Sequence, residues 1–168
     1  MAEIELRYDG LGDRLRSIGP VVVEYDRLGT RARWLGPHEL HYDQLGTRLC
    51  AIGAAAIEYG RFTAAIGKGG LASRPCRLGG RSIEYAGRFL GSRLHRIGSY
   101  EVGWEPGLGN VVRSVGRFVF EYGEGLVVHW APKRVVVPGD SSTLDDDDLI
   151  ILYFVLGVIK ELAPGGTG

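Results

Sequence analysis

The sequence predicts a mainly β fold: an antiparallel hairpin-repeat meander of roughly thirteen to fifteen short strands, curled into a barrel or roll around one buried C-terminal α-helix. Three observations predict it: a segment that recurs every seventeen residues, an alternation of apolar and charged residues within each copy, and one long apolar segment near the C-terminus. We expect a single domain over residues 1–168, with hairpin repeats over 4–137 and the helix over 143–162.

An aromatic residue marks one position of each copy. Ile4, Leu6 and Tyr8 alternate with Glu5 and Arg7, which is the period expected of a strand with one buried face. The aromatic residue therefore lies at the end of the buried face of each outgoing strand. We expect it to be structural at Tyr8, Tyr25, Tyr42, Tyr59, Tyr85, Trp104 and Tyr122.

Each outgoing strand is followed by residues that favour a turn. In the second copy the sequence is Asp26-Arg27-Leu28-Gly29, where aspartate favours the start of a type I turn and glycine favours the left-handed residue that closes it. A second short strand then returns, and Gly19-Pro20 or Gly36-Pro37 turns the chain into the next copy. Each copy is therefore a hairpin, and successive hairpins form a meander.

The expected register follows from a glycine bulge in that turn. It places Glu24 across from Arg31 on one face, which would be a ladder of ion pairs. It places Val21 across from Trp34 and Val23 across from Ala32 on the other face, which would be the core. A shift of one residue would expose the apolar set, so the register is strongly specified.

The C-terminal segment is expected to cover the apolar face of the sheet. Residues 149–159 are apolar throughout, four aspartates (145–148) precede them where the helix dipole favours acids, and Ser141, Ser142 and Thr143 are candidate caps. A helix apolar on every side is buried on every side. We expect the meander to curl around it; a helix laid on an open sheet, or buried by another subunit, is the alternative.

Bulk composition excludes some classes of protein. Twenty basic and twenty acidic residues give no net charge, so no overall field attracts nucleic acid. The apolar segment would rise only about 16 Å as a helix, so no stable membrane span is expected. The two cysteines form no CxxC motif and no signal peptide is recognisable, which favours a cytoplasmic, reduced protein.

The sequence offers one weak set of metal-ligand candidates. Cys50, Cys76 and His95 occupy equivalent positions in successive copies, and Glu39 is expected opposite Cys50. These are zinc ligands by type. Equivalent positions in neighbouring hairpins lie about 10 Å apart, too far to share one ion. We therefore expect no metal, no cofactor and no catalytic set, and interpret these residues as variants of the position held by Arg33.

Arginines also recur in the repeat. The candidates for contact with a partner are Arg31, Arg33, Arg48 and Arg93. Interleaved glutamates keep this face nearly neutral, which favours a solvated ion-pair surface over a groove for nucleic acid.

The Tyr-Asp-x-Leu-Gly turn followed by arginine, with a glycine break after each return strand, resembles the YD repeats of the RHS family over residues 4–122. The resemblance implies a β-hairpin sheet, which in that family spirals into a hollow shell around a toxin. The period of seventeen is shorter than usual for the family, and the chain is too short to enclose a toxin domain. Only the hairpin geometry is carried over.

A repeat scaffold without a catalytic set favours a non-enzymatic binding or assembly module, with a protein partner or a second copy of itself. Two other functions stay open. One is a membrane-acting or toxin-like effector that releases its apolar helix. The other is a small-molecule barrel whose mouth is lined by Trp34, Trp104 and Trp130.

Overall fold

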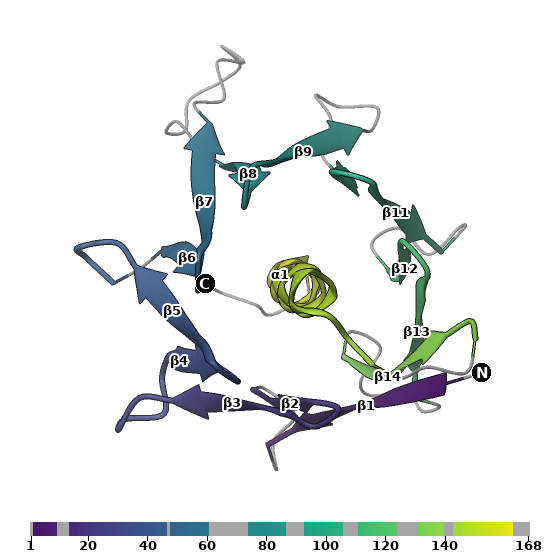
Figure 1. Ribbon diagram of the computed structural model, residues 1–168, viewed down its shortest axis with the longest axis horizontal. Helices are drawn as coiled ribbons and strands as arrows, with labels where there is room; N and C mark the ends of the chain where they lie inside the picture. The colour runs from purple at the N-terminus through teal and green to yellow at the C-terminus, as the bar shows by residue number, and fades with distance from the viewer. Residues whose placement is uncertain are drawn as a thin grey trace.

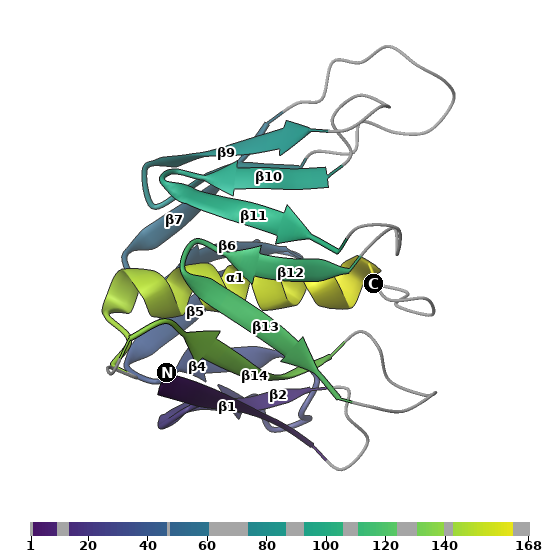
Figure 2. The same cartoon turned by 90° about the vertical axis from the view of Figure 1, so that its right-hand side faces the viewer.

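The protein is a closed antiparallel β-barrel with a helix inside it (Figure 1). The structure, a computed structural model, describes residues 2–9, 14–46, 48–60, 74–86, 93–105, 111–123, 131–139 and 143–162. Fourteen strands form the described barrel wall, and the helix runs along its axis (Figure 2). The predicted mainly β class and the wrapped helix are confirmed.

The strands follow one another around the wall in chain order. They are β1 (Ala2–Tyr8), β2 (Leu15–Ile18), β3 (Val21–Tyr25), β4 (Ala32–Leu35), β5 (His38–Tyr42), β6 (Leu49–Ile52), β7 (Ala55–Gly60), β8 (Arg74–Leu78), β9 (Arg81–Ala86), β10 (Arg93–Ile97), β11 (Tyr100–Trp104), β12 (Val112–Val115), β13 (Phe118–Tyr122) and β14 (Pro132–Val137). The first and last strands close the ring: β1 pairs with β14 through Ala2 opposite Val137 and Ile4 opposite Val135. Closure leaves neither of these strands as an open edge.

Two kinds of connection alternate along the chain. Two-residue turns join β2 to β3 and β4 to β5, with Gly19 and Gly36 at φ values of 56° and 55°, as the glycine signals predict. Longer connections lie at the opposite rim. There Gly29, at φ 66°, closes a turn in which its amide donates to the Asp26 carbonyl at 2.9 Å. The predicted Asp-to-Gly turn is confirmed.

The predicted register is wrong. Glu24 lies opposite Trp34, not Arg31, and Val23 lies opposite Leu35, not Ala32. One cause is the turn, which extends further than expected because the Asp26 carboxylate accepts hydrogen bonds from the amide and hydroxyl of Thr30, at 2.8 and 3.0 Å.

The other cause is a β-bulge at Arg33, which has no partner on β3, where Tyr25 pairs with Ala32 and Glu24 with Trp34. One extra residue reverses the alternation of faces. Trp34, expected in the core, is therefore on the outer face and 39% exposed.

The helix α1 (Asp146–Leu162) begins three residues later than predicted. Its cap is Asp145, whose carboxylate accepts the Asp148 amide at 2.7 Å, while its carbonyl accepts the Leu149 amide at 3.0 Å. Thr143 lies before the helix, and Ser141 and Ser142 are outside the described residues. No helix in the described part of the chain has both the length and the apolarity to cross a membrane.

The core lies between the helix and the inward residues of the strands. Ile151, Leu152 and Val155 of α1 are fully buried. Around them the wall contributes large side chains that are also fully buried: Phe118, Ile18, Leu35, Ile52, Leu78 and Ile97. The helix thus fills the barrel interior that the apolar face of the meander required.

One prediction, the place of Trp130 at a barrel mouth, concerns a residue outside the described ones.

Candidate functional site

The aromatic residues of the repeat form a hydrogen-bonded ladder around the barrel. The Tyr25 hydroxyl donates to the Leu15 carbonyl at 2.7 Å, ten residues earlier on the neighbouring strand. The other members donate in the same way: Tyr42 to Ala32, Tyr59 to Leu49, Tyr85 to Pro75, Trp104 to Leu94 and Tyr122 to Val112. Each bond ties one hairpin to the previous one, so the ladder stabilises the wall between repeats.

The ladder also crosses the seam of the barrel. The Tyr8 hydroxyl donates to the Pro132 carbonyl at 2.8 Å, across 124 positions of sequence. This bond occupies the same place between β1 and β14 as the Tyr25 bond occupies between β3 and β2. The chain therefore closes with the geometry of an ordinary repeat junction.

An arginine lies over five rings of the ladder. The Arg14 guanidinium lies 5.3 Å from the centre of the Tyr25 ring, Arg31 lies 5.1 Å from Tyr42, and three further pairs share the arrangement. They are Arg48 on Tyr59, Arg74 on Tyr85 and Arg93 on Trp104, at 3.8 to 5.2 Å. Of the four predicted partner contacts, Arg31, Arg48 and Arg93 therefore stack against the scaffold's own rings, and Arg33 differs from them.

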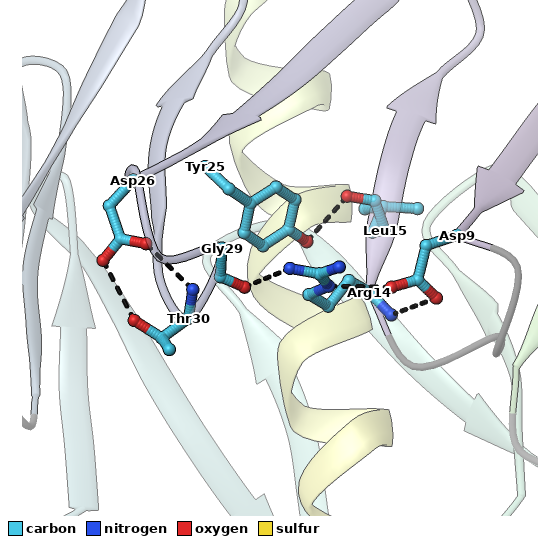
Figure 3. A network of polar contacts seen from close by, with 7 residues as sticks. All are labelled: Asp9, Arg14, Leu15, Tyr25, Asp26, Gly29 and Thr30. Carbon is cyan, nitrogen blue, oxygen red and sulfur yellow. Dashed lines mark hydrogen bonds and ion pairs between the residues drawn. The ribbon is translucent and has the colours of Figure 1, made fainter.

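Figure 3 shows one junction in detail. Arg14 pairs with Asp9 at 2.7 Å and donates to the Gly29 carbonyl in the next turn, so one side chain joins two hairpins. Burial, which outweighs the nearby Arg14 guanidinium, raises the pKa of Tyr25 to about 12. The hydrogen bond from the Thr30 amide is the main cause of the lowered pKa of Asp26. These groups form a structural junction and leave no free base or nucleophile.

The aspartates that begin α1 attach the helix to one rim of the barrel. His38 lies 3.1 Å from Asp146, and Arg81 lies 2.8 Å from Asp147. The buried Asp148 accepts hydrogen bonds from the Tyr100 hydroxyl at 2.8 Å and from Arg117 at 3.0 Å. We call these contacts the rim clasp. They give the aspartates a tertiary role in addition to the expected stabilisation by the helix dipole.

The bulge found at Arg33 recurs in each of the hairpins that the structure describes, whereas the seam between β1 and β14 pairs without a register shift. In each pair of strands the register skips one residue on the returning strand. We call the skipped residues the bulge positions; they are Arg16, Arg33, Cys50, Cys76, His95, Arg113 and Lys133. They lie on alternate strands, so neighbouring members are about 9.6 Å apart, or two strand spacings.

The metal-ligand candidates are therefore distributed, not gathered. Cys50, Cys76 and His95 are bulge positions on β6, β8 and β10, and the two cysteines are free thiols. Glu39 does not lie opposite Cys50; it pairs with Trp34, and its carboxylate is 3.9 Å from His41. Within the described ranges no three histidine, cysteine or acidic residues are close enough to share a metal ion.

Two equivalent clefts lie on the outer surface. One, of about 640 Å³, is lined by Arg14, Arg16 and residues 22–29. The other, of about 320 Å³, is lined by Arg31, Arg33 and residues 39–46. Every lining position of the second lies seventeen residues after its counterpart in the first. We call the outer surface that contains both clefts and Trp34 the cleft face.

Exposed apolar side chains gather on the cleft face. Leu28 and Leu45, at equivalent turn positions in the two clefts, are 85% and 86% exposed. Val22, which lines the first cleft, and Trp34 on β4 are also exposed, whereas Val119 on β13 is exposed elsewhere on the wall. Sequence reasoning missed this surface, although the leucine of the Tyr-Asp-x-Leu-Gly turn was visible; turn chemistry requires the aspartate and the glycine, but not the leucine.

Comparison with known proteins adds no relative: no family model, no curated protein and no solved structure matches this chain.

Proposed function

We propose that the protein is a non-enzymatic binding module that acts through protein–protein contact at the cleft face. The observation that carries the proposal is the pair of equivalent clefts, each bordered by a leucine that is exposed almost completely. Single exposed leucines are ordinary on protein surfaces. Two at the same position of successive repeats, with an exposed tryptophan on β4, give the cleft face several exposed apolar side chains among polar ones, which is a feature of interaction surfaces.

The repeat scaffold supports a binding role. The rings and arginines of the ladder hold each hairpin against the next, so the clefts keep a constant spacing without a bound partner. A preorganised surface loses little conformational entropy when a partner binds. The side chains that are free to contact a partner are those that the ladder does not use, among them Arg33, Leu28 and Leu45.

The other two functions have less support. A small-molecule barrel needs interior space, but α1 packs fully buried side chains into the interior, and Trp34 lies outside. The Trp104 indole, expected at the mouth, donates to the Leu94 carbonyl. An effector that releases its helix would have to break the rim clasp, which ties α1 to β5, β9 and β11 and to Arg117.

We also propose that the repeat is a short relative of the YD repeat. Its support is the hairpin itself, in which tyrosine ends the outgoing strand, aspartate opens the turn and arginine begins the return. Here the sheet encloses one helix of the same chain.

Site-specific photo-crosslinking tests the binding function. A photoreactive residue at position 28 or 45, introduced into the full chain and irradiated in an extract of the source organism, is expected to capture one discrete protein. The same residue at His95, which is exposed on β10 away from the clefts, is the matched control. The captured protein, once purified, should bind the wild-type chain in calorimetry and lose most of its affinity for a Leu28→Ser, Leu45→Ser variant.

Two results would overturn this function. One is crosslinking at positions 28 and 45 that does not exceed that at position 95, combined with a monomeric chain in sedimentation. The other is equal affinity of the captured protein for the wild-type chain and for the double serine variant.

A further inference from the structure

We infer that the first cleft, lined by Arg14, Arg16 and residues 22–29, binds an acidic segment of a partner protein in which carboxylates flank an apolar side chain. This inference rests on the proposed binding function and specifies the chemistry of its partner. It comes from a difference between the two clefts, which share one backbone geometry but not the same charges.

The two clefts have the same framework. In both, the amide of the glycine that closes the turn donates to the carbonyl of the aspartate that opens it, at 2.9 Å. In both, an arginine of the preceding copy donates to the carbonyl of that glycine. Gly29 and Gly46 have nearly the same φ, 66° and 67°. A difference in what the two clefts bind must therefore come from their side chains.

Three equivalent lining positions differ in chemistry. They are Val22, Glu24 and Arg27 in the first cleft and Glu39, His41 and Gln44 in the second. The second cleft thus has an acid 3.9 Å from a histidine and no arginine in its turn. The first cleft instead has an exposed valine and one more arginine. The first cleft is therefore the more basic and the more apolar of the two.

The scaffold uses part of the charge in the first cleft. The Arg14 guanidinium pairs with Asp9 at 2.7 Å (Figure 3). The Asp26 carboxylate accepts hydrogen bonds from the amide and hydroxyl of Thr30. These groups hold the hairpins together and are not available to a partner.

Two cations of the first cleft remain available. Arg16 on β2 and Arg27 in the turn are both exposed, and no carboxylate in the described part of the chain lies within ion-pair distance of either. Glu24 is the remaining acid of the lining, so two available cations face one available acid. The same count in the second cleft leaves Arg33 against Glu39. Only the first cleft therefore has an excess of positive charge.

The available groups fit carboxylates beside an apolar side chain. A guanidinium binds a carboxylate through two parallel N–H···O bonds, so Arg16 and Arg27 are suited to acidic residues. Leu28 and Val22, which are 85% and 55% exposed in the same lining, offer apolar surface next to these cations. The charge complement of this cleft is thus an acidic segment that also carries an apolar residue.

A nucleic acid fits the first cleft less well. Single-stranded nucleic acids stack their bases on aromatic side chains. The Tyr25 ring already has the Arg14 guanidinium 5.3 Å from its centre, and its hydroxyl donates to the Leu15 carbonyl. Glu24 in the lining would also repel a backbone that is charged at every unit.

The test is an NMR titration of the isotope-labelled full chain, because amide shifts locate weak binding residue by residue. The probe is the synthetic peptide Gly-Glu-Leu-Glu-Gly, blocked at both ends. The matched probe has glutamine in place of both glutamates. The acidic probe is expected to give saturable shifts in the first cleft but not in the second, with an affinity that falls as salt is added. The glutamine probe should lose most of that affinity.

Matched variants assign the effect to the cations. An Arg16→Gln, Arg27→Gln variant should weaken binding of the acidic probe about three- to tenfold, since each lost pair is exposed. Arg33→Gln, at the position of the second cleft that is equivalent to Arg16, should leave that affinity unchanged. Gln44→Arg, which supplies the missing cation, should produce saturable shifts in the second cleft.

The inference is overturned if the acidic probe gives no saturable shifts, if the glutamine probe binds equally well, or if both clefts respond alike. Tighter binding of a probe with phosphoserine in place of one glutamate would overturn it in favour of a phosphorylated segment. Self-association in sedimentation that the Arg16→Gln, Arg27→Gln variant abolishes would overturn it in favour of a second copy of the chain.

Failure of this inference is distinguishable from failure of the proposed function. If crosslinking at positions 28 and 45 persists while the acidic probe does not bind, the partner has another chemistry and the binding function stands.

Discussion

The rim clasp makes Asp148 the most informative single substitution in the helix. Its side chain is 7% exposed and accepts hydrogen bonds from Tyr100 and Arg117. In Asp148→Asn one acceptor oxygen stays, but the charge is lost and an amide group faces a donor. Hydrogen bonds to charged groups contribute about 1.5–3 kcal/mol, and Arg117 is half exposed, which lowers the value. We expect a loss of about 2–3 kcal/mol in the free energy of unfolding, which lowers Tm by about 4–12 °C in a chain of this size.

Urea unfolding followed by tryptophan fluorescence measures this loss. The matched control is Asp147→Asn, because Asp147 pairs with Arg81 at 2.8 Å but is 56% exposed, so its removal should cost less than about 1 kcal/mol. The pKa of Tyr100 supplies a second measurement: burial and then the hydrogen bond to Asp148 raise it, so in Asp148→Asn it should move towards the ordinary value. If Asp148→Asn loses no more stability than Asp147→Asn, the clasp does not hold the helix in the barrel.

Three further predictions concern the scaffold. Gly46→Ala should lower the free energy of unfolding by about 1–2 kcal/mol, since φ is 67° and the new methyl overlaps the Arg31 guanidinium. Gly157→Ala, with open space around the added carbon, should instead stabilise the helix by about 0.8–1.0 kcal/mol in the same urea titration. Tyr8→Phe removes the bond to Pro132 and should cost about 0.5–1.5 kcal/mol, with hydrogen exchange accelerated in β1 and β14 before β9; uniform acceleration would refute a local seam. Because the folded pKa of Tyr25 is raised to about 12, its contribution is complete below its ordinary pKa of 10.0 and is lost as pH rises towards 12, so thermal melts should show Tm falling over that interval, and less steeply in Tyr25→Phe.

The sequence predicted the fold well because its signals are local and repeated. The alternation of apolar and charged residues predicted the strands, and Asp26 and Gly29 predicted the turn. An apolar stretch too short to span a membrane predicted the buried helix. Two recurring separations in the sequence also indicate contacts that the sequence analysis did not predict. The arginine of one copy precedes the ring that it covers by eleven residues, and in the first three copies the ring precedes the arginine of the same copy by six.

The register was beyond local reasoning. The hydrogen bonds from Thr30 to the Asp26 carboxylate compete with strand pairing. The bulge at Arg33 adds a residue at a place where the sequence has no glycine to indicate it. Either change alone is a matter of one or two residues, but together they move Trp34 from the core to the surface. The candidate site depended on the register, because the register decides which residues of the cleft face are exposed.

By itself the sequence determined the strand repeats, the turn chemistry, the aromatic ladder positions and the need for a covering helix, since each of these follows from the preferences of neighbouring residues. Only the tertiary structure decided which arginines contact a ring or a carboxylate of the protein and which are available to a partner, because these contacts are made between residues on different strands. It also decided that Lys133 and Arg16 are neighbours. Residues far apart in sequence become neighbours when a sheet closes, and closure depends on the summed twist and bulging of the whole wall rather than on any one repeat.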